Sequence, residues 1–179
     1  MTLISDLPTL RSSGKRQTLA SAFVLIGMIG VISSALGFEH LGGYAPCAMC
    51  LEQRVPYYWG IPLMAVGLAS ALFAGPALLT RGLLAVVMVC LLITAGLGIY
   101  HSGVEWGFFE APVSCGAGLS ATSSDASNLL ESLSTAKPPS CDDAAGRFLG
   151  LSFAGWNVVA AGILAAFAFR GAFGPADLD

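Results

Sequence analysis

The sequence predicts an all-α membrane protein, built as a four-transmembrane-helix bundle with two cysteine-bearing loops on one side of the membrane. Of its 179 residues, 55% are hydrophobic and only 11% are charged, whereas about 25% of the residues of a soluble domain are charged. Four long apolar runs contain no charge at all. Four helices of about 20 residues each fill nearly half of such a chain, so we expect residues 1–179 to form a single membrane domain.

The four runs occupy residues 18–38, 55–74, 82–100 and 148–169. Each is long enough to cross about 30 Å of hydrocarbon as a helix. The first run could instead be the core of a cleaved signal peptide, but such cores contain only about 7–15 apolar residues, so we expect an uncleaved helix. Pro56 and Pro62 either start the second helix or kink it.

Basic residues predict how the bundle is oriented. Four spans place both termini and the turn at 75–81 on one side, with five basic residues, and the loops at 39–54 and 101–147 on the other side, with three. The richer side is expected to be cytoplasmic, so both cysteine-bearing loops are expected to face outward, where disulfides persist. The net charge of -3 gives no indication of nucleic-acid binding.

The first loop carries Cys47 and Cys50 in a Cys-x-x-Cys pair, followed by Arg54. Cysteines at this spacing form reversible disulfides, and a nearby guanidinium favours the reactive thiolate. The pair is therefore interpreted as a redox dithiol. On spacing alone, half of a zinc site or a small structural disulfide remains an alternative.

The second loop contains Cys115 and Cys141. Topology brings both pairs to one membrane face, which favours a relay: a pair in a long loop can meet a soluble thiol, and a pair at the bilayer surface can reach an acceptor in the membrane. A purely structural Cys115–Cys141 disulfide remains open. A zinc site made of all four loop cysteines is disfavoured by the wide spacing of the second pair, and no metal is expected. The fifth cysteine, Cys90, is interpreted as an apolar filler in the third span.

Arg54 and His101 are the candidate cofactor-binding side chains. If the second helix extends back through this segment, Cys47, Cys50 and Arg54 share one helical face, but Pro56 could delay the helix to about Val55. Arg54 could also only snorkel to lipid head groups. His101 either hydrogen-bonds a carbonyl of a bound cofactor or sits at the interface. A short amphipathic helix is also conceivable at 125–135.

Taken together, these residues resemble the disulfide bond formation protein B (DsbB) family. The resemblance is carried by five features spread over most of the chain, which are Pro46-Cys47-Ala48-Met49-Cys50 with Arg54, Cys115, Cys141, the segment Phe148-Leu149-Gly150-Leu151, and Trp156. It implies a bacterial inner-membrane thiol:quinone oxidoreductase that reoxidises a periplasmic thioredoxin-like oxidase, DsbA or a similar protein.

The resemblance also implies roles for single residues. Cys115 would be attacked by the reduced partner, and Cys141 would then exchange with Cys47. Cys50 would pass the electrons to ubiquinone or menaquinone, with Arg54 and His101 near the quinone. A vitamin K epoxide reductase-like enzyme is a rival, but such enzymes generally place the quinone-side pair late in the bundle. A non-catalytic membrane scaffold or metal-binding module with structural disulfides is the rival of another class.

Overall fold

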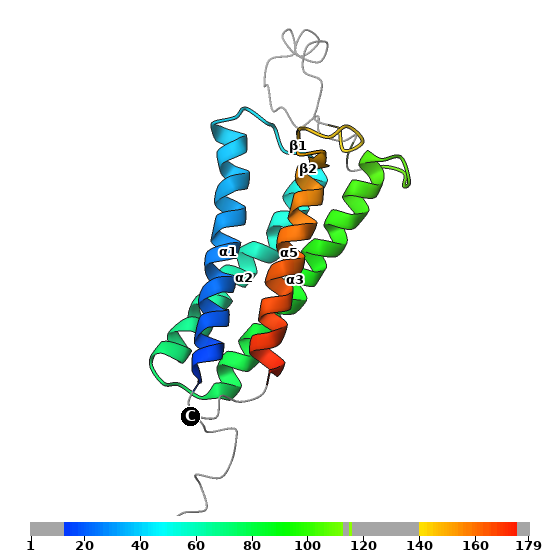
Figure 1. The fold of residues 1–179 in the computed structure, drawn as a ribbon. Helices are drawn as coiled ribbons and strands as arrows, with labels where there is room; N and C mark the ends of the chain where they lie inside the picture. The colour runs from blue at the N-terminus through cyan, green and yellow to red at the C-terminus, as the bar shows by residue number, and fades with distance from the viewer. Residues whose placement is uncertain (1–12, 113–114, 116–139, 175–179) are drawn as a thin grey trace, which may run out of the picture.

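The protein is a bundle of long helices, seen here in a computed structural model that describes residues 13–112, 115 and 140–174 (Figure 1). Within these residues the chain forms four long helices, α1 (Lys15–His40), α2 (Ala48–Leu72), α3 (Ala77–Glu105) and α5 (Phe153–Phe173). All four are long and apolar enough to cross a membrane. The predicted fold class is confirmed.

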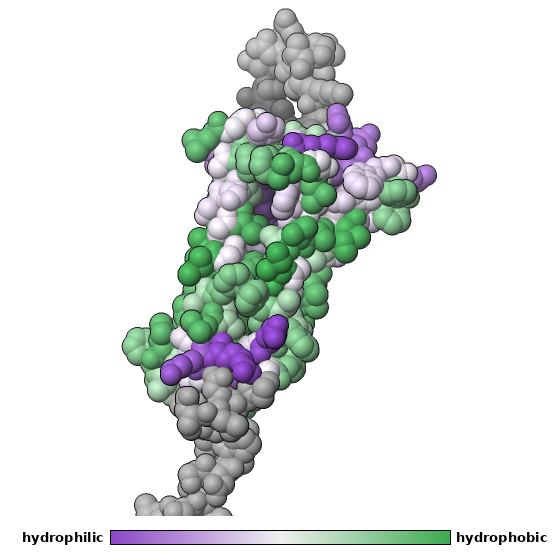
Figure 2. Space-filling model, in the orientation of Figure 1, coloured by the Kyte–Doolittle hydropathy of each residue, from purple (hydrophilic) through white to green (hydrophobic). Residues whose placement is uncertain are grey.

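The core of the bundle lies where the four helices face one another. Val24, Met28, Met64, Leu84 and Ala168 are each 0% exposed there. At Gly171 a Cβ atom would lie 2.7 Å from the Cβ of Ala20, so glycine allows α5 to approach α1 closely, as small residues do in membrane bundles. On the face shown in Figure 2, hydrophobic residues cover the middle of the bundle and hydrophilic residues gather toward its two ends.

Helix α2 begins at Ala48, seven residues before the predicted span at 55–74. The Cys47 side chain caps it, because its sulfur accepts a hydrogen bond from the Cys50 backbone N–H at 3.3 Å. Pro56 and Pro62 therefore lie inside the helix instead of starting it. The helix does extend back through the dithiol, so Cys50 and Arg54 lie one turn apart on α2.

Helix α5 begins at Phe153, five residues after the predicted start of its span. The intervening residues form a hairpin of β1 (Arg147–Phe148) and β2 (Leu151–Ser152), joined by Leu149 and Gly150, which both have positive φ. The Trp156 indole N–H donates to the Phe148 carbonyl at 2.9 Å and ties the hairpin to the helix. The segment expected as the first turn of a span is therefore a β-turn. The short helix considered at 125–135 lies outside the described residues.

The two ends of the bundle carry different parts of the chain. Helices α1 and α3 extend a few residues beyond their predicted spans at both ends, so that His101 lies on α3. The first loop and the hairpin meet at the upper end in Figure 1, and the turn between α2 and α3 lies at the lower end. The upper end thus brings both cysteine-bearing segments together, as the topology predicted.

Candidate active site

Cys47 and Cys50 form a reduced dithiol at the N-terminus of α2. Both are free cysteines, and their sulfur atoms are 2.8 Å apart. The hydrogen bond shared with Cys50 lowers the pKa of the Cys47 thiol well below its usual range; burial opposes this shift, and the hydrogen bond to His101 adds to it. The N-terminus of a helix favours negative charge as well. Cys47 is therefore placed to react as a thiolate.

The second cysteine pair is oxidised and packs against the first. Cys115 and Cys141 form a disulfide, with their Cα atoms 5.6 Å apart. Both belong to one buried cluster with Cys47, Met49 and Val104, and Cys50 packs against this cluster. Because Cys115 and Cys141 are bonded to each other, the four cysteines do not form a shared metal site in this state. The structure brings together all four of the cysteines predicted from the sequence.

Two cavities meet at the dithiol. The larger, of about 480 Å³, lies between α1, α2 and α5 and is lined mainly by apolar side chains together with Cys50, Gln53, Arg54 and Asn157. The smaller, of about 280 Å³, lies toward the second loop and is lined by Cys47, Cys50, His101, Glu105 and Asp143 among others. Cys50 lines both cavities, and Cys47 lines only the smaller.

Arg54 forms an ion pair in the wall of the larger cavity. Its Nη1 donates to Glu39 Oε2 at 2.5 Å, and the two side chains are 12% and 24% exposed. Glu39 is the last but one residue of α1, so this pair also joins α1 to α2. Arg54 and Cys50 both line this cavity. Sequence reasoning selected Arg54 but missed its carboxylate partner.

A buried polar network runs from the dithiol into the bundle. Gln53 Nε2 lies 2.7 Å from His101 Nδ1, and Gln53 Oε1 accepts from Asn157 Nδ2 at 2.8 Å. Asn157 Oδ1 accepts from the Tyr57 hydroxyl at 2.8 Å, and Thr94 Oγ1 donates to the Gln53 backbone carbonyl at 2.7 Å. The signal that could have found this network is an asparagine inside an uncharged membrane span, where polar side chains are rare and functional.

His101 lies on the side of the dithiol away from the larger cavity. Its Nε2 is 3.6 Å from Cys47 Sγ and 3.7 Å from Glu105 Oε1, and its side chain is 3% exposed. It lines the smaller cavity, whereas the larger one is lined by Arg54. The structure therefore joins His101 directly to Cys47, and its expected contact with a bound quinone stays a prediction.

The donor atoms of Cys47, Cys50 and His101 all lie within 4.8 Å of one another, close enough to share a metal ion. Zinc prefers such sulfur and nitrogen ligands in a tetrahedral site. A histidine that binds zinc through Nε2 carries its proton on Nδ1 and donates it to an acceptor. Here the Gln53 amide nitrogen faces Nδ1. The hydrogen bonds around His101 therefore favour a donor at Nε2 over a metal ligand.

A helical membrane bundle that holds a reactive dithiol against a second, oxidised cysteine pair defines a membrane thiol–disulfide oxidoreductase. The sequence model of the family described as disulfide bond formation protein DsbB matches residues 16–170. The chain belongs to this family, whose members act in disulfide bond formation, so the resemblance predicted from the cysteine motifs is confirmed.

Two relatives support this placement to different degrees. The disulfide bond formation protein B of Saccharophagus degradans is 32% identical over 176 residues, which cover 94% of this chain and 96% of the relative. An uncharacterized protein of Rickettsia prowazekii is 24% identical over 129 residues, 72% of each chain. No solved structure matches the chain.

Proposed function

We propose that this protein oxidises the dithiol of a periplasmic thioredoxin-like oxidase of the DsbA type and passes the electrons to a membrane quinone, ubiquinone or menaquinone. One observation carries the proposal: Cys50 lines an apolar cavity, its sulfur lies 2.8 Å from Cys47, and Cys47 packs in one cluster with the second disulfide. The four cysteines thus form a continuous path from the loop to the cavity.

On the donor side, the exposure of the second pair supports an order of exchange. Cys115 is 8% exposed and Cys141 is 1% exposed, and an attacking thiolate must reach a sulfur directly. The reduced partner attacks Cys115 and releases the Cys141 thiolate. Cys141 then attacks Cys47 of the oxidised Cys47–Cys50 disulfide and releases Cys50. The second thiolate of the partner attacks the mixed disulfide, so the partner leaves oxidised and Cys115 is freed. Cys115 then attacks Cys141 of the Cys141–Cys47 disulfide and releases Cys47, so that Cys47 and Cys50 remain as the dithiol present in this structure.

On the acceptor side, the larger cavity fits a quinone head group. Its volume of about 480 Å³ and its apolar walls between three helices suit a lipid-soluble ring, and Arg54 can donate a hydrogen bond to a ring carbonyl. A bound quinone supplies a two-electron, two-proton acceptor for the dithiol. Cys50 presents its sulfur to this cavity, Arg54 holds positive charge beside it, and the apolar walls exclude water.

The orientation belongs to the same proposal. We place both termini in the cytoplasm and the upper end of the bundle in the periplasm of a bacterial inner membrane. In the described residues, Lys15, Arg16, Arg81 and Arg170 lie at the lower end of the bundle, and Arg54 and Arg147 lie at the upper end. This distribution agrees with the positive-inside rule. Two variants test this orientation, each without the native cysteines and with one new cysteine, Ser13→Cys or Asp142→Cys. A membrane-impermeant maleimide added from the periplasmic side should label Asp142→Cys and leave Ser13→Cys unlabelled.

The proposal is tested with purified protein, a reduced thioredoxin-like partner and a quinone whose absorbance is followed. Wild-type protein is expected to couple loss of partner thiols to quinone reduction, and Cys50→Ser is expected to stop it. Cys90→Ser is the matched control, since Cys90 lies on α3 away from both cavities. A non-catalytic scaffold would instead leave Cys115–Cys141 unreactive toward the partner, and a metal-binding module would release zinc on thiol titration.

A further inference from the structure

Gln53 occupies the centre of the buried polar network, one turn of α2 after Met49. The residue is only 5% exposed. Its amide group meets partners from three directions, which are Asn157 on α5, His101 on α3 and the Met49 carbonyl on its own helix. An amide has one acceptor end and one donor end, so these partners decide which end faces His101.

The partners of Gln53 fix the orientation of its amide. Thr94 Oγ1 donates its proton to the Gln53 backbone carbonyl at 2.7 Å, so it can only accept from Asn157 Nδ2, 3.2 Å away. The same Asn157 amide nitrogen donates to Gln53 Oε1 at 2.8 Å. On the other side, Gln53 Nε2 donates to the Met49 carbonyl at 3.3 Å. Both ends of the Gln53 amide are therefore assigned by groups whose own role is fixed.

His101 takes its tautomer from Gln53. Gln53 Nε2 lies 2.7 Å from His101 Nδ1, so Nδ1 accepts, and in the neutral imidazole the proton is on Nε2. His101 Nε2 is 3.6 Å from Cys47 Sγ, which is a hydrogen-bond distance to the large sulfur atom. The N–H of His101 therefore faces Cys47 as a donor.

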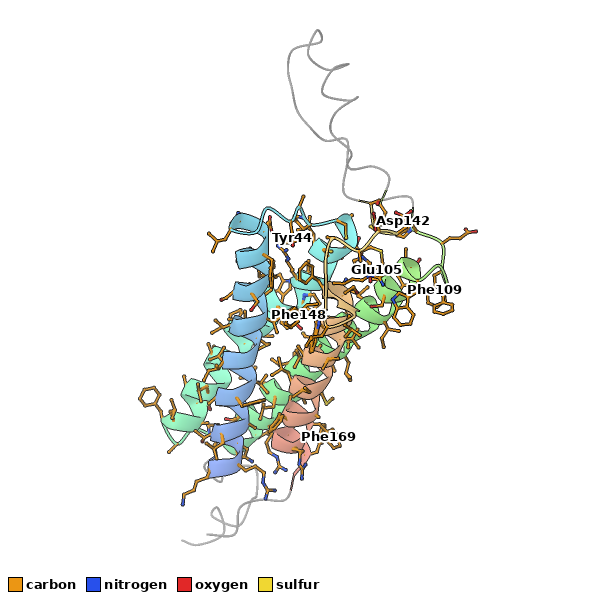
Figure 3. All side chains as sticks on the ribbon, turned by 45° about the horizontal axis from the view of Figure 1, so that its top comes forward. Tyr44, Glu105, Phe109, Asp142, Phe148 and Phe169 are labelled. Carbon is orange, nitrogen blue, oxygen red and sulfur yellow. A yellow bond between two sulfur atoms is a disulfide. The ribbon has the colours of Figure 1, made fainter. Side chains whose placement is uncertain are left out.

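Glu105 is a second acceptor near this N–H. It lies one turn after His101, at the upper end of α3 (Figure 3). His101 Nε2 to Glu105 Oε1 is 3.7 Å, which is too long for a hydrogen bond to oxygen. Among the described residues, the Cys47 sulfur is thus the acceptor at hydrogen-bond distance from Nε2.

We propose that Gln53 is a positioning residue that orients the His101 N–H before Cys47 leaves as a thiolate. While Cys47 is part of a disulfide, its sulfur carries no charge that could orient the imidazole, so the orientation has to come from the other ring nitrogen. A donor that is already oriented stabilises a charge as it develops, without reorganisation at that moment. A stabilised thiolate is also the better leaving group in disulfide exchange. Gln53 thus acts on Cys47 through His101.

The step that this donor assists is the last exchange in the proposed order. The Cys115 thiolate attacks Cys141 of the Cys141–Cys47 disulfide. The Cys115–Cys141 bond forms, the Cys141–Cys47 bond breaks, and the electron pair stays on Cys47. No proton moves in this step, because Cys50 is released one exchange earlier and takes its proton from water then. This step rests on the proposed function, whereas the orientation of the imidazole and the stability of the thiolate need neither partner nor quinone.

The first test is a double-mutant cycle on the reduction potential of the Cys47–Cys50 pair. The potential is measured in glutathione or dithiothreitol buffers, with each disulfide quantified by alkylation and peptide mass spectrometry. A stabilised thiolate makes the pair more oxidising, and a hydrogen bond to a charged group changes an equilibrium constant about tenfold or more. Gln53→Met, with an apolar side chain of similar length, is therefore expected to lower the potential by about 30 mV, which corresponds to tenfold.

The cycle is completed with His101→Phe and the double variant. His101→Phe should lower the potential at least as much, and the double variant should match His101→Phe alone, because Gln53 acts through the imidazole. Glu52→Gln, which changes the adjacent exposed carboxylate on α2, is the control and should keep the wild-type value. A Gln53 that only joins the helices would give additive shifts, and these would overturn the inference. A wild-type potential in Gln53→Met would do the same.

The second test locates the ring proton directly, and it applies even if Gln53→Met does not fold. The chain has two histidines, so nitrogen NMR of protein with isotope-labelled histidine shows two rings, and His40→Gln identifies the exposed one. With the Cys47–Cys50 pair oxidised and the ring neutral, His101 of the wild type is expected to carry its proton on Nε2. A wild-type proton on Nδ1 would overturn the inference.

Two variants sharpen the NMR test. Gln53→Glu, whose carboxylate can only accept, should bring a proton to His101 Nδ1. Tyr57→Phe removes another hydrogen bond of the same network and should leave Nδ1 without a proton. Equal spectra in Gln53→Glu and Tyr57→Phe would count against the inference. A wild-type protein that shows the expected tautomer and potentials, but does not exchange with a reduced thioredoxin-like partner, would overturn the proposed function alone.

Discussion

The two ends of the helical bundle use their polar residues differently. At the lower end they close the helices: Arg81 Nε and Nη2 donate to the carbonyls of Ala172 and Gly174 at 2.7 and 2.6 Å, and the Ser13 and Thr80 hydroxyls lie 2.9 Å apart. At the upper end the polar residues line two cavities, and Glu105 keeps an unpaired oxygen. Polar side chains that hydrogen-bond backbone carbonyls stabilise the fold, whereas polar side chains that line a cavity are candidates for a role in the reaction.

The upper end is also held together by hydrogen bonds between residues far apart in the sequence. The Gln53–Asn157 hydrogen bond joins residues 104 positions apart, and Gln53–His101 joins residues 48 apart. These contacts draw α2, α3 and α5 together around the dithiol. Amide and imidazole groups inside the bundle have no water as a hydrogen-bond partner, so their hydrogen bonds to one another hold the three helices in place around the dithiol.

The largest expected effect is loss of all turnover in Cys50→Ser. Cys50 is the sulfur that lines both cavities, so its removal separates the disulfide exchange from the acceptor. Quinone reduction by a reduced partner should fall to background, while Cys90→Ser retains the wild-type rate. Normal quinone reduction in Cys50→Ser would remove the functional distinction between the two ends.

The second prediction concerns Cys115→Ser, which should prevent a mixed disulfide with the partner. Cys115 is the more exposed residue of the second pair, and without it the partner has no disulfide to attack. A non-reducing gel of wild-type protein mixed with a partner that lacks its resolving cysteine should show a trapped complex. The Cys115→Ser lane should lack it, and a complex of equal intensity there would assign the attack to another sulfur.

The third prediction is the pH dependence of Cys47. Because its pKa is lowered, the thiolate persists below the usual thiol range and is lost only as the pH falls through the lowered value. Alkylation of Cys47 should therefore change little between pH 8 and 6, whereas a free cysteine peptide, with a pKa of about 8.5, slows about tenfold per pH unit there. A parallel fall at Cys47 would show that the cap and His101 do not stabilise its thiolate.

The fourth prediction is a moderate loss of quinone affinity in Arg54→Ala. A hydrogen bond from a charged group contributes about 1.5–3 kcal/mol, so the apparent KM for quinone should rise at least about tenfold. The KM for the partner should hold, because Arg54 lies in the cavity wall and not in the second loop. Arg147→Ala, at an exposed strand residue of the same end, is the control. An unaltered quinone KM would leave Arg54 with only its ion pair to Glu39.

These residues also show what the sequence could and could not predict. Four charge-free runs sufficed for the four helices, because lipid requires every backbone group to bond within its own segment. The same constraint carries α2 through Pro56 and Pro62, which a rule drawn from soluble helices would place at a helix start. Cys47, Cys50, Cys115 and Cys141 were identifiable by type and topology.

Glu39, Gln53 and Asn157 were missed, since their roles arise from contacts between helices. Glu39 gains its importance from Arg54, 15 residues later, and Gln53 from Asn157, 104 residues later. Neither distance has a periodic signature in the chain. Packing decides which of the polar residues near a span end faces a cavity and which faces the head groups.

The smallest effect on activity is expected at the lower end, in Arg81→Ala. Its two hydrogen bonds close the C-terminus of α5, and each contributes about 0.5–1.5 kcal/mol, or somewhat more with a charged donor. Thermal unfolding in detergent should therefore occur at a lower temperature, while quinone reduction per folded molecule stays at the wild-type level. Arg170→Ala, which removes another arginine from the last turn of the same helix, is the variant for comparison. A loss of turnover in folded Arg81→Ala protein would mean that the lower end communicates with the dithiol, and the division between a structural end and a chemical end would not hold.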